Sequence, residues 1–177
     1  MLLKTKLVSA VLVAAVLCIM CSTAFADTVR VVSVEGGFMI DLPPDADAEE
    51  NSIGDADSGA AAFMWHTANG DFTIGFVDGM RRSAEPAAFF AELNKTVVRD
   101  QRRAGARVLE KTDLSFEGNP GMELRLQRGD SVVVERFILV KNRLYVLTAD
   151  MTAIDSADEA AHILDSFELI DGTALIA

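Results

Sequence analysis

The amino-acid sequence predicts an α+β fold in which an antiparallel β-sheet is sandwiched between helices, an α/β/α arrangement. Four consecutive segments have strand character and very short connections, so neighbouring strands should run antiparallel: residues 107–116, 121–128, 131–140 and 143–150. The stretches "FILV" and "LYVL" within the last two segments are apolar on both faces, which is typical of strands covered on both sides. Segments with helical periodicity precede and follow this meander and would supply the two covers.

Two strands are predicted at the start of the domain. The stretch "VRVVSV", residues 29–34, alternates weakly, and "FMIDL", residues 38–42, follows a turn at Gly36 and Gly37. Two prolines end the second strand, because proline cannot donate a hydrogen bond to the sheet ladder.

The next segment, residues 41–57, carries seven carboxylates and is expected to be an acidic surface loop. Asn69 and Gly70 then lie between two apolar stretches, "AAAFMWHTA" and "DFTIGFV". Asn-Gly is the strongest short signal for a two-residue hairpin, so these stretches are predicted as paired strands.

A helix should begin near Ser83 as N-cap, with Pro86 in its first turn, and end at Gly105. Its apolar face is formed by Phe90, Leu93, Val97 and Ala104. A second helix is expected over residues 156–169, because Ser156 and Glu159 have the spacing of a capping box.

The stretch "EGNPGMELRLQR" could be read as a glycine-rich phosphate loop or as a turn. A phosphate loop needs a helix directly after it, whose N-terminus faces the anion. Here period-2 alternation follows instead, with Met122, Leu124 and Leu126 on one side. We therefore predict a tight turn over residues 118–121, with Pro120 and Gly121 supplying the turn dihedral angles.

In order and spacing, several motifs resemble the Mog1/PsbP-like superfamily, including its DcrB-like bacterial branch of exported proteins. They are "GNPG" followed by the acidic Glu123, the strand ending at Arg136-Phe137, "NRLY", the "SF" near residue 167 and the early "GGFMIDLP". The resemblance covers about residues 36–170 and implies the α/β/α sandwich. Members of the superfamily are mostly assembly or binding proteins: a photosystem II extrinsic subunit, a Ran-binding protein and chaperone-like proteins. The resemblance implies no chemistry, and it does not carry the photosystem role over to this chain.

Residues 1–26 are predicted to be a Sec signal peptide. Lys4 and Lys6 precede an apolar run, and "AFA", residues 24–26, is a small-x-small cleavage site. Cleavage after Ala26 would leave a single domain, residues 27–177, in the periplasm or outside the cell, without a membrane span; a retained anchor is the alternative. Both cysteines, Cys18 and Cys21, lie in the leader, so the mature domain would form no disulfide.

The net charge of −11 argues against nucleic acid as a partner. The basic residues, however, gather in one region. We expect partner binding at Arg99, Arg102, Arg103 and Arg107, although a helix C-terminus favours basic residues without any ligand. The sequence thus predicts an exported, non-catalytic module that binds another envelope or secreted protein, whose identity the sequence does not give.

The alternative function is binding of a cation or small ligand by the acidic segment 41–57, with Asp45 and Asp47 as candidates. An EF-hand frame starting at Asp45 fails, because its sixth position is Glu50 where glycine is needed. No metal or cofactor is therefore predicted. The only catalytic grouping, His162 with Asp165 and Ser166, lacks a nucleophile turn, so no catalytic residue is predicted. Trp65 and Tyr145 are expected to pack against the sheet.

Overall fold

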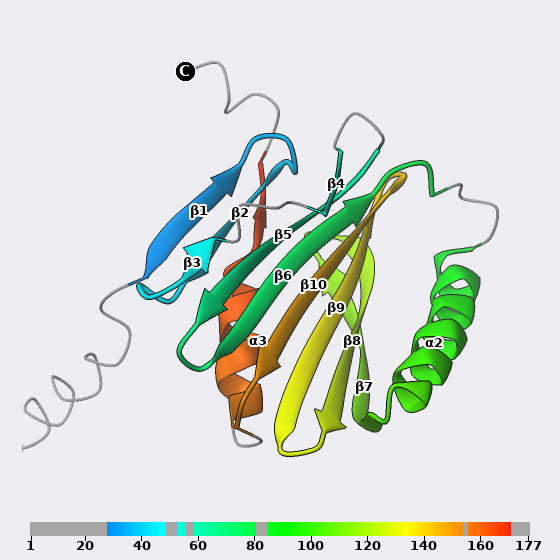
Figure 1. Ribbon diagram of the computed structural model, residues 1–177. Helices are drawn as coiled ribbons and strands as arrows, with labels where there is room; N and C mark the ends of the chain where they lie inside the picture. Colours follow the sequence, from blue (N-terminus) through cyan, green and yellow to red (C-terminus); the bar gives the residue numbers. More distant parts are fainter. Residues whose placement is uncertain (1–27, 49–52, 56–58, 81–84, 154–155, 171–177) are drawn as a thin grey trace, which may run out of the picture.

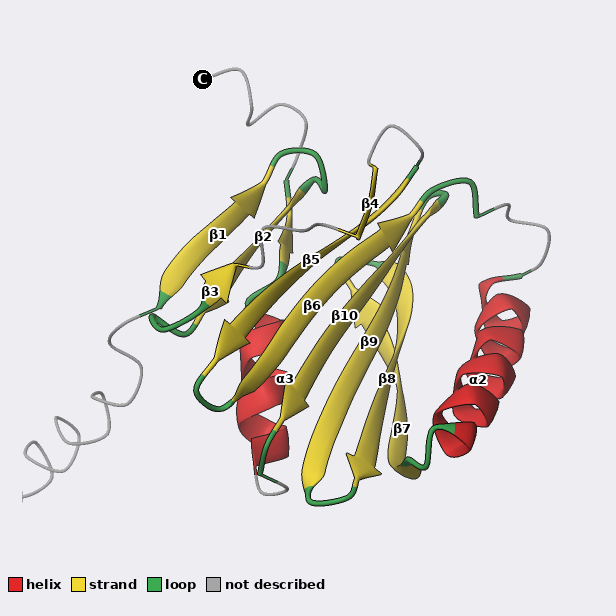
Figure 2. Ribbon diagram, viewed as in Figure 1, coloured by secondary structure: helices red, strands yellow, loops and turns green. Residues whose placement is uncertain are grey.

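The computed structural model describes residues 28–48, 53–55, 59–80, 85–153 and 156–170. Within these residues the chain forms an eight-stranded antiparallel sheet, a three-stranded sheet and two helices (Figures 1 and 2). The larger sheet has the order β3-β5-β6-β10-β9-β8-β7, with β4 also pairing β5. Its strands are β3 (Asp47–Ala48), β4 (Ile53–Asp55), β5 (Ala60–Thr67), β6 (Gly70–Val77), β7 (Arg107–Phe116), β8 (Asn119–Arg128), β9 (Ser131–Val140) and β10 (Arg143–Met151).

The smaller sheet has the order β1-β2-β11 and consists of β1 (Val29–Ser33), β2 (Phe38–Leu42) and β11 (Glu168–Leu169). Together with helix α3 (Ala157–Asp165), it covers one face of the larger sheet, while helix α2 (Pro86–Arg103) lies against the other face (Figure 1). This arrangement confirms the predicted α+β sandwich. It adds the small sheet as a cover that the sequence did not indicate.

The two covered faces have separate hydrophobic cores. Successive residues of β9 point to alternate faces, so Val134 packs toward α3 and Val133 packs toward α2. The α3 side contains most of the large buried aromatic residues, including Phe38, Phe72, Phe76 and Phe167. The α2 side is smaller, and within the described residues of helix α2 only Phe90 is buried.

The predicted turn at residues 118–121 is displaced by two residues. Glu117 and Gly118 form the turn with φ angles of 48° and 77°, and Asn119 already pairs with Phe116 in the hairpin. Two successive positive φ angles match the twist of a two-residue hairpin. The predicted role of Gly121 in the turn is wrong, because this glycine lies inside β8, where an added Cβ would be 2.9 Å from the carbonyl oxygen of Phe137. No helix follows this hairpin, so the turn interpretation is confirmed over the phosphate loop.

The last predicted helix, residues 156–169, is too long. Helix α3 ends at Asp165, and β11 then pairs Glu168 with Met39 of β2. Ser156 occupies the N-cap as predicted, but its side chain makes no capping hydrogen bond, so the capping box is wrong. The N-cap predicted at Ser83 lies outside the described residues.

The acidic segment 41–57 is not simply a loop. Asp41 and Leu42 belong to β2, and the short strands β3 and β4 both pair with β5. The remaining predicted strands agree with the structure. The predicted hairpin joins β5 to β6, but its turn lies one residue earlier, at Ala68 and Asn69, because Gly70 already pairs with Thr67.

Candidate functional site: a cationic groove along helix α2

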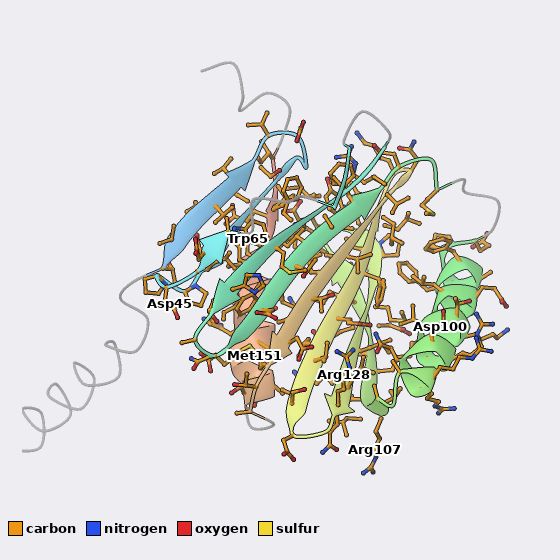
Figure 3. The ribbon with its side chains drawn as sticks, viewed as in Figure 1. Asp45, Trp65, Asp100, Arg107, Arg128 and Met151 are labelled. Atoms are coloured by element: carbon orange, nitrogen blue, oxygen red, sulfur yellow. The ribbon has the colours of Figure 1, made fainter. Side chains whose placement is uncertain are left out.

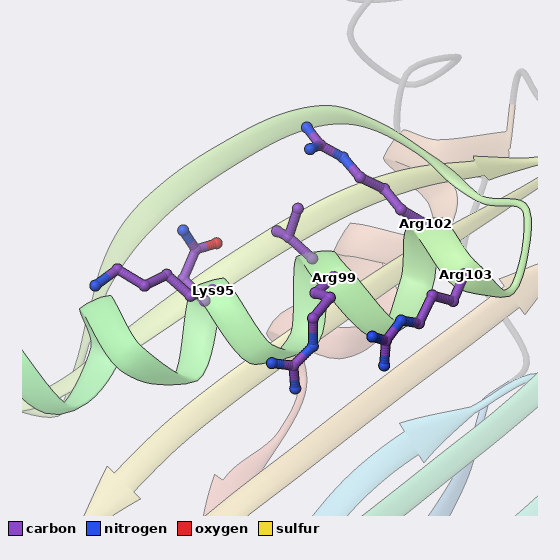
Figure 4. A pocket seen from close by; sticks show the side chains of 6 residues that line it. Lys95, Arg99, Arg102 and Arg103 are labelled. Carbon is purple, nitrogen blue, oxygen red and sulfur yellow. The ribbon is translucent and has the colours of Figure 1, made fainter.

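The basic residues singled out by the sequence lie in the C-terminal half of helix α2. Arg99, Arg102 and Arg103, together with Lys95, line a groove of about 580 Å³ (Figure 4). Spacings of three and four residues bring these side chains onto neighbouring positions of the helix surface. The other lining residues are Asn94 and Val98. From here on this surface is called the α2 groove.

Arg107 does not line the α2 groove. The helix ends at Arg103, and Gly105 adopts a φ of 83°, which turns the chain into β7. Arg107 is the first residue of that strand and is exposed at the foot of the sheet (Figure 3). The structure therefore brings together three of the four predicted arginines and adds Lys95.

The cations of the α2 groove exceed the carboxylates beside them. Asp100 is shared by Arg99 Nε at 3.1 Å and Arg103 Nη1 at 3.7 Å, and Lys95 pairs with Glu92 at 2.6 Å. Among the described residues Arg102 forms no ion pair. These pairs are exposed, so water screens them and leaves the guanidinium groups available to a competing carboxylate. Arg102 and Arg103 also lie in the last helical turn, where the helix dipole favours positive charge.

The centre of the α2 groove is not purely cationic. Val98 is half-buried there, and the Oδ1 atom of Asn94 is buried without a hydrogen-bond partner. Leaving a buried acceptor unpaired costs free energy, so packing within the chain does not account for this amide.

A second polar cluster, which the sequence analysis missed, lies between α2 and the sheet. Glu135 of β9 is 8% exposed, and its Oε1 accepts a hydrogen bond of 2.5 Å from Gln101 of α2. Gln101 Oε1 in turn accepts from Arg128, whose other nitrogen donates to Asp150 at 3.0 Å. Burial raises the pKa of Glu135 to about 7. The negative charge of Asp150 also raises this pKa, whereas the positive charge of Arg128 lowers it. A lone acid inside the apolar run "VVVERFILV" was the available signal.

Glu135 borders a groove of about 410 Å³ along the other side of α2, with Phe137 and Val146 as apolar lining. Its Oε2 atom is buried without a hydrogen-bond partner. The carboxyl group therefore joins the helix to the sheet through only one of its two oxygens.

The candidate cation ligands in the acidic segment, Asp45 and Asp47, lie in structural positions. The carboxylate of Asp45 accepts the backbone N–H of Ala68 at 2.8 Å, and Asp47 lies in β3 opposite His66. The part of the chain that the structure describes contains no group of three or more His, Cys, Asp or Glu side chains that could hold a metal ion. The rest of this segment lies outside the described residues.

Ser166 has a structural role at the end of α3. Its hydroxyl donates to the carbonyl of Ile163 at 2.7 Å and accepts the N–H of Asp41 at 2.9 Å, which ties the helix to β2. A serine nucleophile needs this hydroxyl free and directed at a base. Trp65 and Tyr145 are buried, 7% and 4% exposed, as expected for packing residues.

Comparison with solved structures identifies the scaffold. Over 84% of this chain and 95% of the other, the structure is similar to cyanobacterial PsbP (CyanoP) from Synechocystis sp. PCC 6803, with a TM-score of 0.57 and 12% identity. Two weaker similarities are to PA94 from Pseudomonas aeruginosa and to a protein from Bacteroides thetaiotaomicron VPI-5482. PA94 has a TM-score of 0.45, 14% identity and coverage of 79% and 93%. The Bacteroides protein has a TM-score of 0.40, 16% identity and coverage of 81% and 49%.

The sequence matches no protein-family model, and comparison with curated proteins gives no match either. The DcrB-like branch named in the sequence analysis thus stays a prediction. At these identities the structural similarity defines the fold and leaves the activity open. The chain has the Mog1/PsbP-like fold.

Proposed function

We propose that this chain is an exported, non-catalytic accessory or assembly protein that binds another protein through the cationic surface of helix α2. The observation that carries this proposal is the surplus of exposed cations on the helix, in a chain whose net charge is −11. A local patch of the opposite sign to the whole molecule attracts and orients a partner that carries the complementary charge. Export is part of the proposal and rests on the leader sequence, residues 1–26.

The scaffold agrees with this role. The fold shared with a PsbP protein is compatible with an accessory module, and the hydroxyl of Ser166 is engaged in the packing of α3. No helix among the described residues is long and apolar enough to span a membrane.

The test is affinity capture of the tagged mature protein from its own envelope fraction, with crosslinking and mass spectrometry. The variant Arg102→Glu/Arg103→Glu should lose the dominant crosslinked protein while it stays folded, with a melting temperature lowered only slightly because glutamate is unfavourable at a helix C-terminus. Lys111→Glu/Lys141→Glu is the matched control, because it changes the net charge equally on other exposed parts of the molecule. Equal capture by both double variants would contradict the proposal.

Cation binding by the acidic segment is the second candidate function. A rise in melting temperature with millimolar calcium that disappears in Asp45→Asn/Asp47→Asn would support it, and no rise would end it.

A further inference from the structure

We propose that the α2 groove recognises an extended acidic peptide segment of the partner, in which carboxylates flank an apolar side chain. This inference rests on the proposed function and deepens it by naming the chemistry of the partner. It starts from three features that occur in one surface: excess cations, a half-buried valine and an unpaired buried acceptor.

The cations define the charge of the ligand. Arg99 and Arg103 share one carboxylate, and Arg102 forms no ion pair among the described residues. Carboxylates of a bound segment would form charge-assisted, bidentate hydrogen bonds with these guanidinium groups. The groove follows the helix from Asn94 to Arg103, so several acidic residues can be accommodated along its length.

Asn94 and Val98 define what else the ligand must carry. The unpaired Oδ1 of Asn94 is itself buried, but the side chain is only half-buried, so rotation of the amide would bring Oδ1 to a backbone N–H of a bound peptide. Val98 offers apolar surface beside it, which fits one aliphatic side chain of the segment. A phosphate group or a simple anion supplies no apolar side chain for Val98, so this residue favours a peptide.

The charge of the whole chain argues in the same direction. A net charge of −11 repels extended polyanions such as an anionic membrane or a nucleic acid, whose fields act over the whole molecule. A short acidic segment can reach the local groove without bringing a large negative surface against the remainder of the protein.

The experiment uses the mature protein and a fluorescein-labelled peptide of sequence EDLEDE, followed by fluorescence anisotropy at low ionic strength. We expect saturable binding that weakens with added salt, and no binding of the amide counterpart QNLQNQ. Arg102→Gln should weaken binding by about tenfold, the worth of a hydrogen bond to a charged group. Asn94→Ala should weaken it several-fold, and Lys141→Gln serves as the matched control with unchanged affinity.

Three outcomes would overturn the inference. The first is no binding of EDLEDE at millimolar concentration, the second is equal binding by wild type and Arg102→Gln, and the third is binding only to phosphatidylglycerol vesicles. If the arginine-dependent partner capture persists in any of these cases, the proposed function stands and only the acidic-peptide inference fails. If the protein shows neither acidic-peptide binding nor arginine-dependent partner capture, the α2 groove is not its binding surface.

Discussion

Glu123 and Arg136 form an ion pair of 2.7 Å across strands β8 and β9, and both side chains are buried, 6% and 9% exposed. Arg136 also donates to the carbonyl of Ala161 at 3.1 Å and pairs with Asp165 at 2.8 Å. The pair therefore anchors helix α3 to the sheet. Both residues belong to the motifs quoted for the resemblance, and their contacts in this chain are structural, since they hold α3 on the sheet.

Breaking this ion pair should destabilise the fold strongly. In Arg136→Met a buried carboxylate keeps only Arg125 as its partner, and we expect a loss of about 3 kcal/mol in the free energy of unfolding. The double variant Glu123→Leu/Arg136→Met should recover part of this loss, because no buried unpaired charge remains and Asp165, which loses Arg136 as a partner, is exposed to water. Urea unfolding measures the free energy of unfolding of the single and the double variant. A single-variant loss below about 1 kcal/mol would show that the pair is dispensable.

The buried carboxyl group of Glu135 should make stability depend on pH. Its pKa is raised to about 7 in the folded state, against 4.5 ordinarily, so the folded chain holds a proton that the unfolded chain releases. The contribution of Glu135 to the free energy of unfolding is therefore fully present below pH 4.5. It is lost as the pH rises to about 7, and the loss is about 3 kcal/mol at most.

Glu135→Gln is the control, because glutamine keeps the bonding geometry and does not titrate. Thermal unfolding between pH 4.5 and 8 should show a falling stability for wild type relative to this variant. The comparison is needed because Asp41 and Asp78 have lowered pKa values, through hydrogen bonds from Arg30 and Arg143, and they act in the opposite direction at acid pH. If the stability of wild type and of Glu135→Gln changed with pH in the same way, the raised pKa of Glu135 would be contradicted.

Gly121 should tolerate no side chain. An added Cβ would lie 2.9 Å from the carbonyl oxygen of Phe137 on the neighbouring strand, so the backbone itself would have to move. We expect Gly121→Ala to cost about 1–3 kcal/mol in the free energy of unfolding. Gly75→Ala is the matched control within a strand, since its Cβ would approach the carbonyl oxygen of Ala61 only to 3.4 Å. A cost at Gly121 no larger than at Gly75 would contradict the close approach.

Replacing Arg143 with lysine should lower the stability of the fold. Its guanidinium binds both carboxylate oxygens of Asp78 at 2.7 and 2.8 Å, donates to the carbonyl of Gly36 at 3.0 Å and lies 4.1 Å from the centre of the Phe76 ring. Lysine keeps the charge but lacks the planar fork, so Arg143→Lys should lose about 1–2 kcal/mol of stability. A chemical denaturation curve identical to that of wild type would show that charge alone suffices.

The sequence predicted those parts of the fold that depend on local pattern. The alternation of Met122, Leu124 and Leu126 and the Asn69-Gly70 dipeptide each specify their strands within a few residues. The displaced turn shows the limit. Asn119-Pro120-Gly121 has strong turn propensity, yet the register of the whole hairpin places the turn at Glu117 and Gly118.

Long-range features escaped prediction for the same reason. Strand β11 exists only because Leu169 pairs with Phe38, far away in the sequence, and a two-residue strand has no periodicity of its own. The helix positions of Arg99, Arg102 and Arg103 followed from local spacing, whereas the unpaired acceptors on Asn94 and Glu135 depend on tertiary packing. Arg107 was grouped with the helix arginines as a binding residue, although the sequence already placed it at the start of the strand 107–116, and the structure shows that it does not line the same surface.

The central claim is that the cationic surface of α2 binds a partner protein, and capture by crosslinking tests it most directly. The experiment compares Arg102→Glu/Arg103→Glu with Lys111→Glu/Lys141→Glu in the native envelope fraction. The account predicts one dominant crosslinked protein, retained by the second variant and lost by the first. The same partner captured equally by both would contradict it.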